Sequence, residues 1–179
     1  KVVYPAFPYD AKGLLATALE DENPILFFEH KLLYRTIYQD VPTVYYTIPF
    51  GKAALLNNGI SISIITYGLG VHWALEVVKT HNISADILDL RTLQPLDIDA
   101  IYTTVKKTGK ILILQEDTLF GGIASDISAL IAEHCFKYLD APIKRVGSIE
   151  TPIPFANPLE NNYLPKNRLF NEIMELLNY

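Results

Sequence analysis

Two glycines and a distant acidic residue form the pattern in this sequence that could bind a dinucleotide. Gly68 and Gly70 lie between an apolar strand-like run and a helix-like run, and Asp89 ends the next strand-like run. Such glycines let the backbone approach a pyrophosphate, and the acidic side chain binds a ribose. Trp73 occupies the position of the third glycine and would block close packing of the helix on the strand. We therefore favour a tight strand-to-helix turn over a nucleotide site.

A second pair of glycines and a pair of acids could also bind ligands. Gly121 and Gly122 precede a helix-like segment, so their N–H groups could hold an anion. No lysine follows at the spacing of a phosphate-binding loop, and we favour glycines that permit close packing. Glu116 and Asp117 end a fully apolar run, at the strand end where α/β sheets gather ligands. One of these two carboxylates is expected only to cap the loop.

Histidine, cysteine and serine residues show no catalytic arrangement. The histidines lack metal-ligand spacing: His30, His72, His81 and His134. Cys135 adjoins His134 on a helix-like segment, but adjacent helical side chains point about 100° apart and cannot form a nucleophile–base pair. The serines lack the context of a nucleophile elbow. We therefore predict no catalytic residue and no cofactor-binding residue in this sequence.

The elements that would position these groups alternate between strand and helix from residue 51 onward. Strands are expected at 52–56, 60–66, 85–90, 111–114 and 143–146. Helices are expected at 71–80, 98–107, 123–136 and 167–177, and the proline-rich stretch 151–165 as an ordered crossing loop. This alternation predicts an α/β sandwich with a mostly parallel sheet. Asn57-Asn58-Gly59 predicts a hairpin between the first two strands, which makes one strand antiparallel.

The first fifty residues follow a different pattern. Apolar residues recur at helical spacing, at Leu14, Leu15, Ala18 and Leu19. Asp10 is expected to cap this helix and Pro24 to end it, and residues 24–29 are expected to form a short buried strand. One helix and one strand cannot enclose a core, so this segment predicts the end of a larger domain. Residues 31–50 contain two prolines and five aromatics and predict a linker laid along another surface.

Composition excludes several classes of protein. The 15 basic and 20 acidic residues give a net charge of -5, whereas nucleic-acid binding requires a concentrated basic surface. A single cysteine excludes a disulfide framework and fits a reducing compartment. No apolar run is long enough to span a bilayer. The sequence opens at Lys1 without a methionine or a signal pattern, so we expect a piece of a longer polypeptide.

Several long strings occur in the order found in one protein family. They are VVYPAFPYDAKGLLATALEDENPILFFEHKLLYR, TIPFGKA, ITYG, DILDLRTLQPLDIDAI, KTGKILILQED, GGIASDI and APIKRV. Over essentially its whole length the chain resembles the C-terminal part of the beta subunit of thiamine-diphosphate-dependent 2-oxo acid dehydrogenases. The resemblance implies that residues 1–35 are the tail of a pyrimidine-binding domain, 36–50 a linker, and 51–179 a transketolase C-terminal-like domain. Such a domain is a three-layer α/β/α sandwich with a mixed, mostly parallel five-stranded sheet.

The resemblance also implies an activity for the complete subunit. That activity is decarboxylation of a 2-oxo acid and reductive acylation of a lipoyl group, with thiamine diphosphate and magnesium bound upstream of Lys1. The string TPIPFANPLENNYLP favours the branched-chain (2-oxoisovalerate) type, whereas FFEHKLLYR and YTIPFGKA also occur in pyruvate enzymes. The fragment alone is expected to be inactive. The alternatives are a free-standing small-ligand-binding α/β module and a nicotinamide-dependent reductase domain.

Sites and partners also follow from the resemblance. Related beta subunits bind potassium, largely through carbonyl oxygens, at positions that correspond to Ala18, Asp21 and Asn23. They assemble with an alpha subunit, or an alpha region of a fused chain, and with a second beta copy. Their C-terminal carboxylate, here on Tyr179, helps bind the subunit-binding domain of the lipoyl acyltransferase. Neither nucleic acid nor membrane is an expected partner, and the expected location is the cytoplasm, or the mitochondrial matrix in a eukaryote.

Aromatic residues in excess of what one small core needs would supply surface for pairing with the second copy. They are Tyr45, Tyr46, Phe50, Trp73, Phe120, Phe136 and Phe155.

Overall fold

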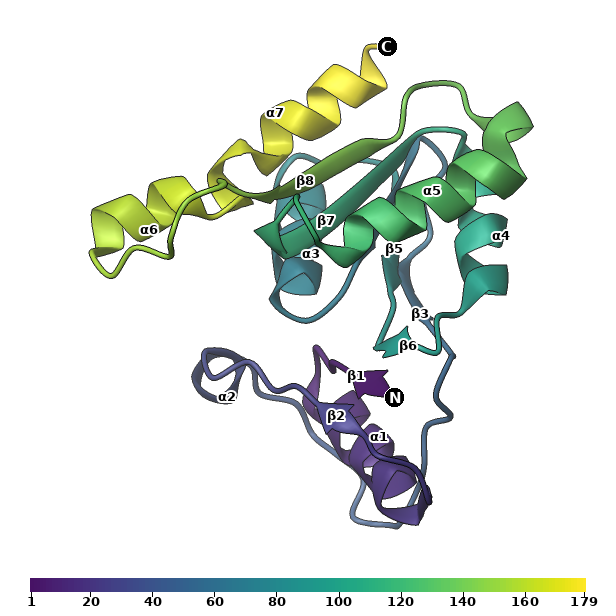
Figure 1. Cartoon of the computed structure of the whole chain (residues 1–179), viewed down its shortest axis with the longest axis vertical. Coiled ribbons are helices and arrows are strands. Elements are labelled where there is room, and N and C mark those ends of the chain that lie inside the picture. The colour runs from purple at the N-terminus through teal and green to yellow at the C-terminus, as the bar shows by residue number, and fades with distance from the viewer.

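A five-stranded sheet organises residues 51–179 in the computed structural model, which describes all of residues 1–179 (Figure 1). Its strands run in the order β3-β5-β4-β7-β8. Their bounds are β3 (Ala54–Asn57), β4 (Ile62–Thr66), β5 (Ala85–Asp89), β7 (Ile111–Thr118) and β8 (Lys144–Ser148). β3 is antiparallel to β5, and the other pairs are parallel. All residues of β4 and β5 are buried, as expected of strands covered on both faces.

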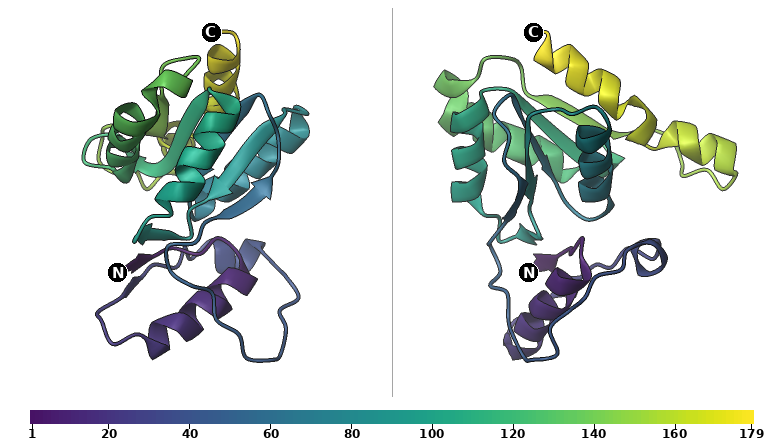
Figure 2. Two further views of the ribbon diagram at one scale, coloured as in Figure 1. Left: turned by 90° about the vertical axis from the view of Figure 1, so that its right-hand side faces the viewer. Right: turned by 180° about the vertical axis from the view of Figure 1, so that it is seen from behind.

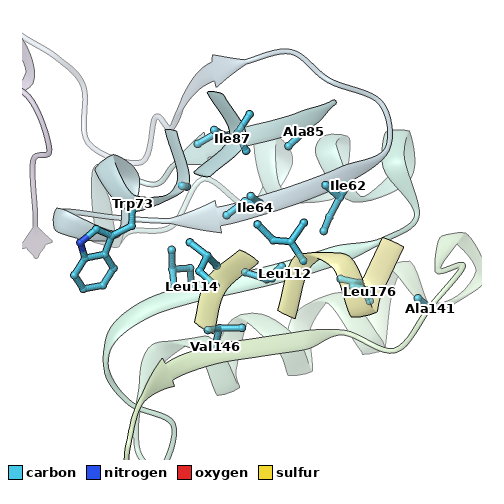
Figure 3. Close-up of a cluster of buried hydrophobic side chains, with 14 of the residues drawn as sticks. Ile62, Ile64, Trp73, Ala85, Ile87, Leu112, Leu114, Ala141, Val146 and Leu176 are labelled. Carbon is cyan, nitrogen blue, oxygen red and sulfur yellow. The ribbon is translucent and has the colours of Figure 1, made fainter. Parts of the chain in front are cut away.

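Helices cover both faces of this sheet and complete a three-layer α/β/α sandwich (Figure 2). α3 (Leu69–Thr80) and α7 (Lys166–Leu177) pack on one face, over Ile64, Leu112 and Val146 (Figure 3). α4 (Ile98–Thr108) and α5 (Ile123–Cys135) pack on the other. The predicted mixed, mostly parallel sheet of the transketolase C-terminal type is therefore confirmed. None of the helices is both long and apolar enough to cross a membrane.

The predicted hairpin between the first two strands is wrong. β5 lies between β3 and β4 in the sheet, so those two strands do not pair. The Asn57-Asn58-Gly59 segment instead crosses the start of β5, and the Gly59 N–H donates to Ala85 O at 3.0 Å. A β-carbon at residue 59 would lie 2.5 Å from the Ala85 carbonyl carbon. Glycine is needed here for a close backbone crossing and not for a hairpin turn.

Residues 1–50 form a smaller unit beneath the sandwich (Figure 1). Its elements are β1 (Val2–Val3), α1 (Pro8–Glu20), β2 (Leu26–Phe27) and α2 (Leu33–Thr36). α1 begins at Pro8 with Phe7 as its cap residue, so the predicted capping by Asp10 is wrong. The strand expected at 24–29 is reduced to two residues and is not buried, since Leu26 is 62% exposed. A piece of a larger domain would leave such a strand uncovered.

The segment expected as a linker lies along α1. Ile48 N–H donates to Gly13 O at 3.0 Å, and Tyr46 stacks on Tyr9 with ring centroids 4.6 Å apart. A β-carbon at residue 13 would lie 2.6 Å from Ile48 Cγ1, so the glycine permits this contact. Further along the chain, the stretch 151–165 is not only a loop, because it contains α6 (Asn157–Tyr163). A 3-10 helix, η1 (Phe136–Tyr138), follows α5.

Candidate functional site

The geometry around Gly68 excludes a dinucleotide site at this turn. The ring of Tyr4 covers the glycine, and a β-carbon there would lie 2.9 Å from Tyr4 Cε2. The space that a pyrophosphate would need is therefore filled by the chain itself. Trp73 is buried in the core beneath α3, and Asp89 is fully buried. With no acidic side chain free to bind a ribose, the turn serves close packing, as the sequence favoured.

Asp89 instead belongs to a buried charge cluster that joins the two units. Its Oδ1 accepts a hydrogen bond from the Arg91 backbone N–H at 3.0 Å. The Arg91 guanidinium reaches into the N-terminal unit, where Nη2 lies 2.7 Å from Asp10 Oδ1. Asp10 is 2% exposed, and its role is to hold Arg91. Because Asp10 and Asp89 are both buried, and Arg91 contacts Asp10 through its side chain and Asp89 through its backbone, Arg91 forms a specific connection between α1 and the end of β5.

The rest of the DLRTLQPLD string, residues 89–97, completes this joint. β6 (Thr92–Gln94) pairs antiparallel with β1 in a three-stranded sheet of order β2-β1-β6. Thr92 Oγ1 accepts a hydrogen bond from the Gly51 N–H at 2.9 Å. Asp97 caps α4 through the Ala100 N–H and also accepts from the Ala53 N–H. The sequence analysis did not predict β6 or the contacts of Thr92 and Asp97. The many polar residues between the preceding strand and α4 could have indicated that this segment makes specific hydrogen bonds.

Burial of Asp89 has a consequence for the pH dependence of stability. Desolvation raises the pKa of Asp89 from 3.8 to about 7, against the hydrogen bond from Arg91. Between those values the folded chain holds a proton that the unfolded chain has released, so folding is favoured at low pH. We expect the free energy of unfolding to fall as pH rises from about 4 to 7. The free energy of unfolding should fall by at most about 1.4 kcal/mol per pH unit, and by a few kcal/mol over the whole range.

Asp89→Asn should remove most of this slope in urea unfolding measured across that pH range. Burial also raises the pKa of Asp10, so a smaller slope of the same sign remains. An unchanged slope in the variant would show that Asp89 does not carry the effect.

The remaining groups singled out in the sequence have structural partners. His30 Nε2 lies 3.0 Å from Glu116 Oε1, so this pair links the N-terminal unit to the end of β7. A β-carbon at Gly122 would overlap the Gln115 side chain, whose Oε1 accepts from the Ala124 N–H at the start of α5. The Gln115 side chain therefore occupies the position that an anion would take. Across the whole chain no three His, Cys, Asp or Glu side chains gather as metal ligands do.

The end of α1 offers carbonyl oxygens to a cation. The helix ends at Glu20, and the backbone oxygens of Ala18, Asp21 and Asn23 accept no backbone hydrogen bond. The Asp21 carboxylate is already engaged by Lys1 Nζ and by the Asn23 N–H, and Lys1 holds its pKa at about 2. At this end of the helix the three carbonyl oxygens, and not the carboxylate, lack a hydrogen-bond partner.

The C-terminus lies at the end of the molecule opposite residues 1–50 (Figures 1 and 2). Ile173 and Leu176 of α7 are buried in the core of the sandwich. Tyr179 is 74% exposed and lines a groove of about 610 Å³ with Phe136 and Ile143. In the last turn of α7, Lys110 Nζ donates to Leu177 O at 2.7 Å. This hydrogen bond satisfies one of the carbonyls at the end of the helix.

The aromatic residues expected to supply pairing surface divide into three groups. Trp73 is a core residue and is 5% exposed, so it is removed from the set. Tyr45, Phe120, Phe136 and Phe155 are exposed, and Phe155 fully so. The half-buried Tyr46 and Phe50 pack within the N-terminal unit.

The three-layer sandwich with one antiparallel edge strand places the chain in a known structural class. Residues 51–168 match the family described as transketolase, C-terminal domain. The chain therefore belongs to the transketolase C-terminal domain family. Among solved structures, it is similar to a split-gene transketolase described as an inactive beta4 tetramer, with a TM-score of 0.76 and 22% identity. That similarity covers 99% of this chain and 57% of the other and concerns the fold alone.

Curated relatives are beta subunits of dehydrogenases and of a related oxidoreductase. The chain is 48% identical to the 2-oxoisovalerate dehydrogenase subunit beta of Bacillus subtilis strain 168, over 92% of this chain and 51% of the relative. It is 44% identical to that organism's acetoin:2,6-dichlorophenolindophenol oxidoreductase subunit beta, over 99% and 53%. It is also 44% identical to the organism's pyruvate dehydrogenase E1 component subunit beta, over 94% and 52%. The chain thus spans about half the length of these relatives.

Proposed function

We propose that this chain is the C-terminal half of the beta subunit of a thiamine-diphosphate-dependent 2-oxo acid dehydrogenase, where it supports subunit assembly and docking of the acyltransferase. The observation that carries the proposal is 48% identity over 92% of the chain to a 2-oxoisovalerate dehydrogenase subunit beta. The buried connection between Arg91 and Asp10 supports an assembly role, because it holds residues 1–50 on the sandwich.

The residues of this chain do not fit thiamine diphosphate itself. Tyr4 covers Gly68, and Gln115 fills the space beside Gly122, so neither glycine turn can receive a diphosphate. The cofactor, with its magnesium, is therefore assigned to the other half of the subunit and to the alpha partner. There the thiamine ring would act as electron sink for decarboxylation. In this proposal, the joint at residues 89–97 fixes the two units of this chain relative to each other, and Tyr179 helps bind the acyltransferase.

We propose the branched-chain substrate 2-oxoisovalerate, with pyruvate as the second candidate. The test is turnover by the complete beta subunit with its alpha partner and a lipoyl acceptor, with 2-oxoisovalerate, pyruvate and acetoin compared side by side. We expect the highest kcat/KM with 2-oxoisovalerate and no turnover by the isolated chain 1–179, which serves as the blank. Preference for acetoin would show that the subunit belongs to an acetoin oxidoreductase and not to a 2-oxo acid dehydrogenase. Turnover by the isolated chain would contradict the proposal that the other half of the subunit binds the cofactor.

Potassium at the end of α1 would be held by the carbonyls of Ala18, Asp21 and Asn23. An ion that binds only the folded state stabilises it by about 1.4 kcal/mol at tenfold its dissociation constant. We expect the melting temperature of the complete subunit, about twice the length of this chain, to rise by about 2 °C in potassium over tetramethylammonium at equal ionic strength. Identical melting temperatures in the two salts would argue against the site.

Docking of the acyltransferase is proposed to use the Tyr179 carboxylate beside the groove that contains Phe136. A buried charge-assisted hydrogen bond is worth about 1.5–3 kcal/mol. Deletion of Tyr179 moves the terminal carboxylate back by one residue, onto Asn178, and this displacement should weaken binding of the acyltransferase's subunit-binding domain by about ten- to a hundredfold in calorimetry. Tyr179→Phe retains the carboxylate and is the matched control, for which we expect nearly unchanged affinity. Equal affinity after the deletion would exclude this role.

We also propose that the complete subunit pairs with a second beta copy and with an alpha subunit. The exposed aromatic residues Phe120 and Phe155 supply apolar surface for such contacts.

A further inference from the structure

A cavity lies between the N-terminal unit and the sandwich, where Leu93 of the joint contributes to its wall, and it is distinct from the C-terminal groove. Its volume is about 350 Å³, which is within the range of small-ligand pockets, about 300–1,000 Å³. It opens at the carboxyl ends of β4 and β7. The order β3-β5-β4-β7-β8 makes this the point where successive connections leave in opposite directions. In open α/β sheets, ligands bind in the crevice at such a switch point.

The walls of the cavity are aromatic. Tyr4 is central, with its ring centroid 5.5 Å from that of Tyr67 and 6.0 Å from that of Phe28. Tyr163 adds a fourth ring from α6. Because these rings come from four separate segments, they surround a ligand rather than form one flat surface. The π face of an aromatic ring attracts a cation.

The charged groups that line the cavity are all acidic, namely Glu116, Asp117 and Glu160. No lysine or arginine lines it, and His30, outside the lining, pairs with Glu116 Oε1 at 3.0 Å. Burial, together with Glu116, raises the pKa of Tyr4 to about 12, and burial and Asp117 also raise the pKa of Tyr67. The phenols therefore stay neutral, and the cavity carries negative charge at neutral pH.

We infer that this cavity binds a small organic cation, with its flat apolar body against the aromatic wall that Tyr4 and Tyr67 form together and its ammonium or amidinium head at Glu116. The inference is independent of the proposed dehydrogenase function, since it rests on the cavity alone. Anionic ligands are disfavoured by the three carboxylates. Neutral ligands would gain the aromatic contacts but not the charge-assisted hydrogen bond.

Three molecules of the same shape and different charge test the inference: benzamidine (cation), benzamide (neutral) and benzoate (anion). Binding is measured by calorimetry on the full-length polypeptide that carries this chain. A cation–π contact and an acidic partner together predict that benzamidine binds about tenfold more tightly than benzamide. Benzoate should not bind measurably. Equal affinity for benzamidine and benzamide, or no binding of benzamidine because another segment fills the cavity, would overturn the inference.

Matched variants locate the binding. Glu116→Gln should reduce the affinity for benzamidine about tenfold and leave that for benzamide unchanged. Glu160→Gln, on the exposed side of the cavity, should reduce it about threefold at no risk to folding. His30→Gln frees Glu116 and should not weaken binding, and Glu76→Gln, which lies outside the cavity, should have no effect. Undiminished affinity in both the Glu116 and the Glu160 variants would show that benzamidine binds elsewhere.

Discussion

Replacement of Arg91 by alanine should lower the melting temperature of the chain by roughly 10 °C. The Arg91 guanidinium lies 2.7 Å from the carboxylate of Asp10, which is 2% exposed. Removal of one partner leaves a buried carboxylate without a counter-charge, which costs about 3–5 kcal/mol. For a chain of this size, each kcal/mol shifts the melting temperature by about 2–4 °C. Thermal unfolding followed by circular dichroism measures the change.

Two further variants separate the ion pair from general effects of substitution. Lys166→Ala breaks the exposed pair with Glu76, whose side chain is 57% exposed, and should change stability by less than about 0.5 kcal/mol. Asp10→Asn added to Arg91→Ala removes the buried charge and should recover more than half of the loss. If the Arg91 and Lys166 variants unfold at the same temperature, Arg91 does not hold the two units together.

Gly59→Ala should lower stability about as much as Arg91→Ala does. The cause here is overlap with backbone atoms and not the loss of a charge. A β-carbon at residue 59 would lie 2.5 Å from the Ala85 carbonyl carbon and closer still to Ala85 N. Neither backbone atom can move without disturbing β5, which is central to the sheet. Overpacking of this kind costs about 1–3 kcal/mol and occasionally more, and we expect about 3 kcal/mol or more in urea unfolding.

Gly121→Ala is the control for the loss of a glycine. Gly121 has a φ of +70°, yet a β-carbon there would meet nothing within 4 Å. Its replacement should cost only the strain of a left-handed backbone, about 1 kcal/mol. Equal losses in the Gly59 and Gly121 variants would mean that the chain crossing over β5 tolerates a side chain.

The sandwich is predictable because most of its strands contain short apolar runs that alternate with amphipathic helices. Continuous burial of β4 and β5 produces runs that can hardly be misassigned. The partner of β3 is not predictable, because Asn-Gly sequences suit both a hairpin and a tight crossing. Only tertiary packing against Ala85 decides between them. The short strand β6 is not predicted from the sequence either, because three residues are too few to show a periodic pattern.

The candidate sites are only partly predictable. Asp10 and Asp89 stand out by position, but local patterns assign them the roles of a cap and a ribose ligand. Their actual contacts pass through Arg91, which is 81 residues from Asp10 and only two from Asp89. A single sequence does not reveal pairs so far apart. The resemblance to beta subunits, by contrast, rests on long strings across the whole chain, and for that reason it identifies the family.

A chimera tests the central claim most directly. In it, this chain replaces the corresponding half of the Bacillus subtilis 2-oxoisovalerate dehydrogenase subunit beta, to which it is 48% identical. The measurement is 2-oxoisovalerate-dependent acylation of a lipoyl domain in the presence of the alpha subunit. If the chain is the assembly and docking half of such a subunit, the chimera co-purifies with the alpha subunit and retains turnover. A chimera that folds but neither binds the alpha subunit nor acylates the lipoyl domain would contradict the account.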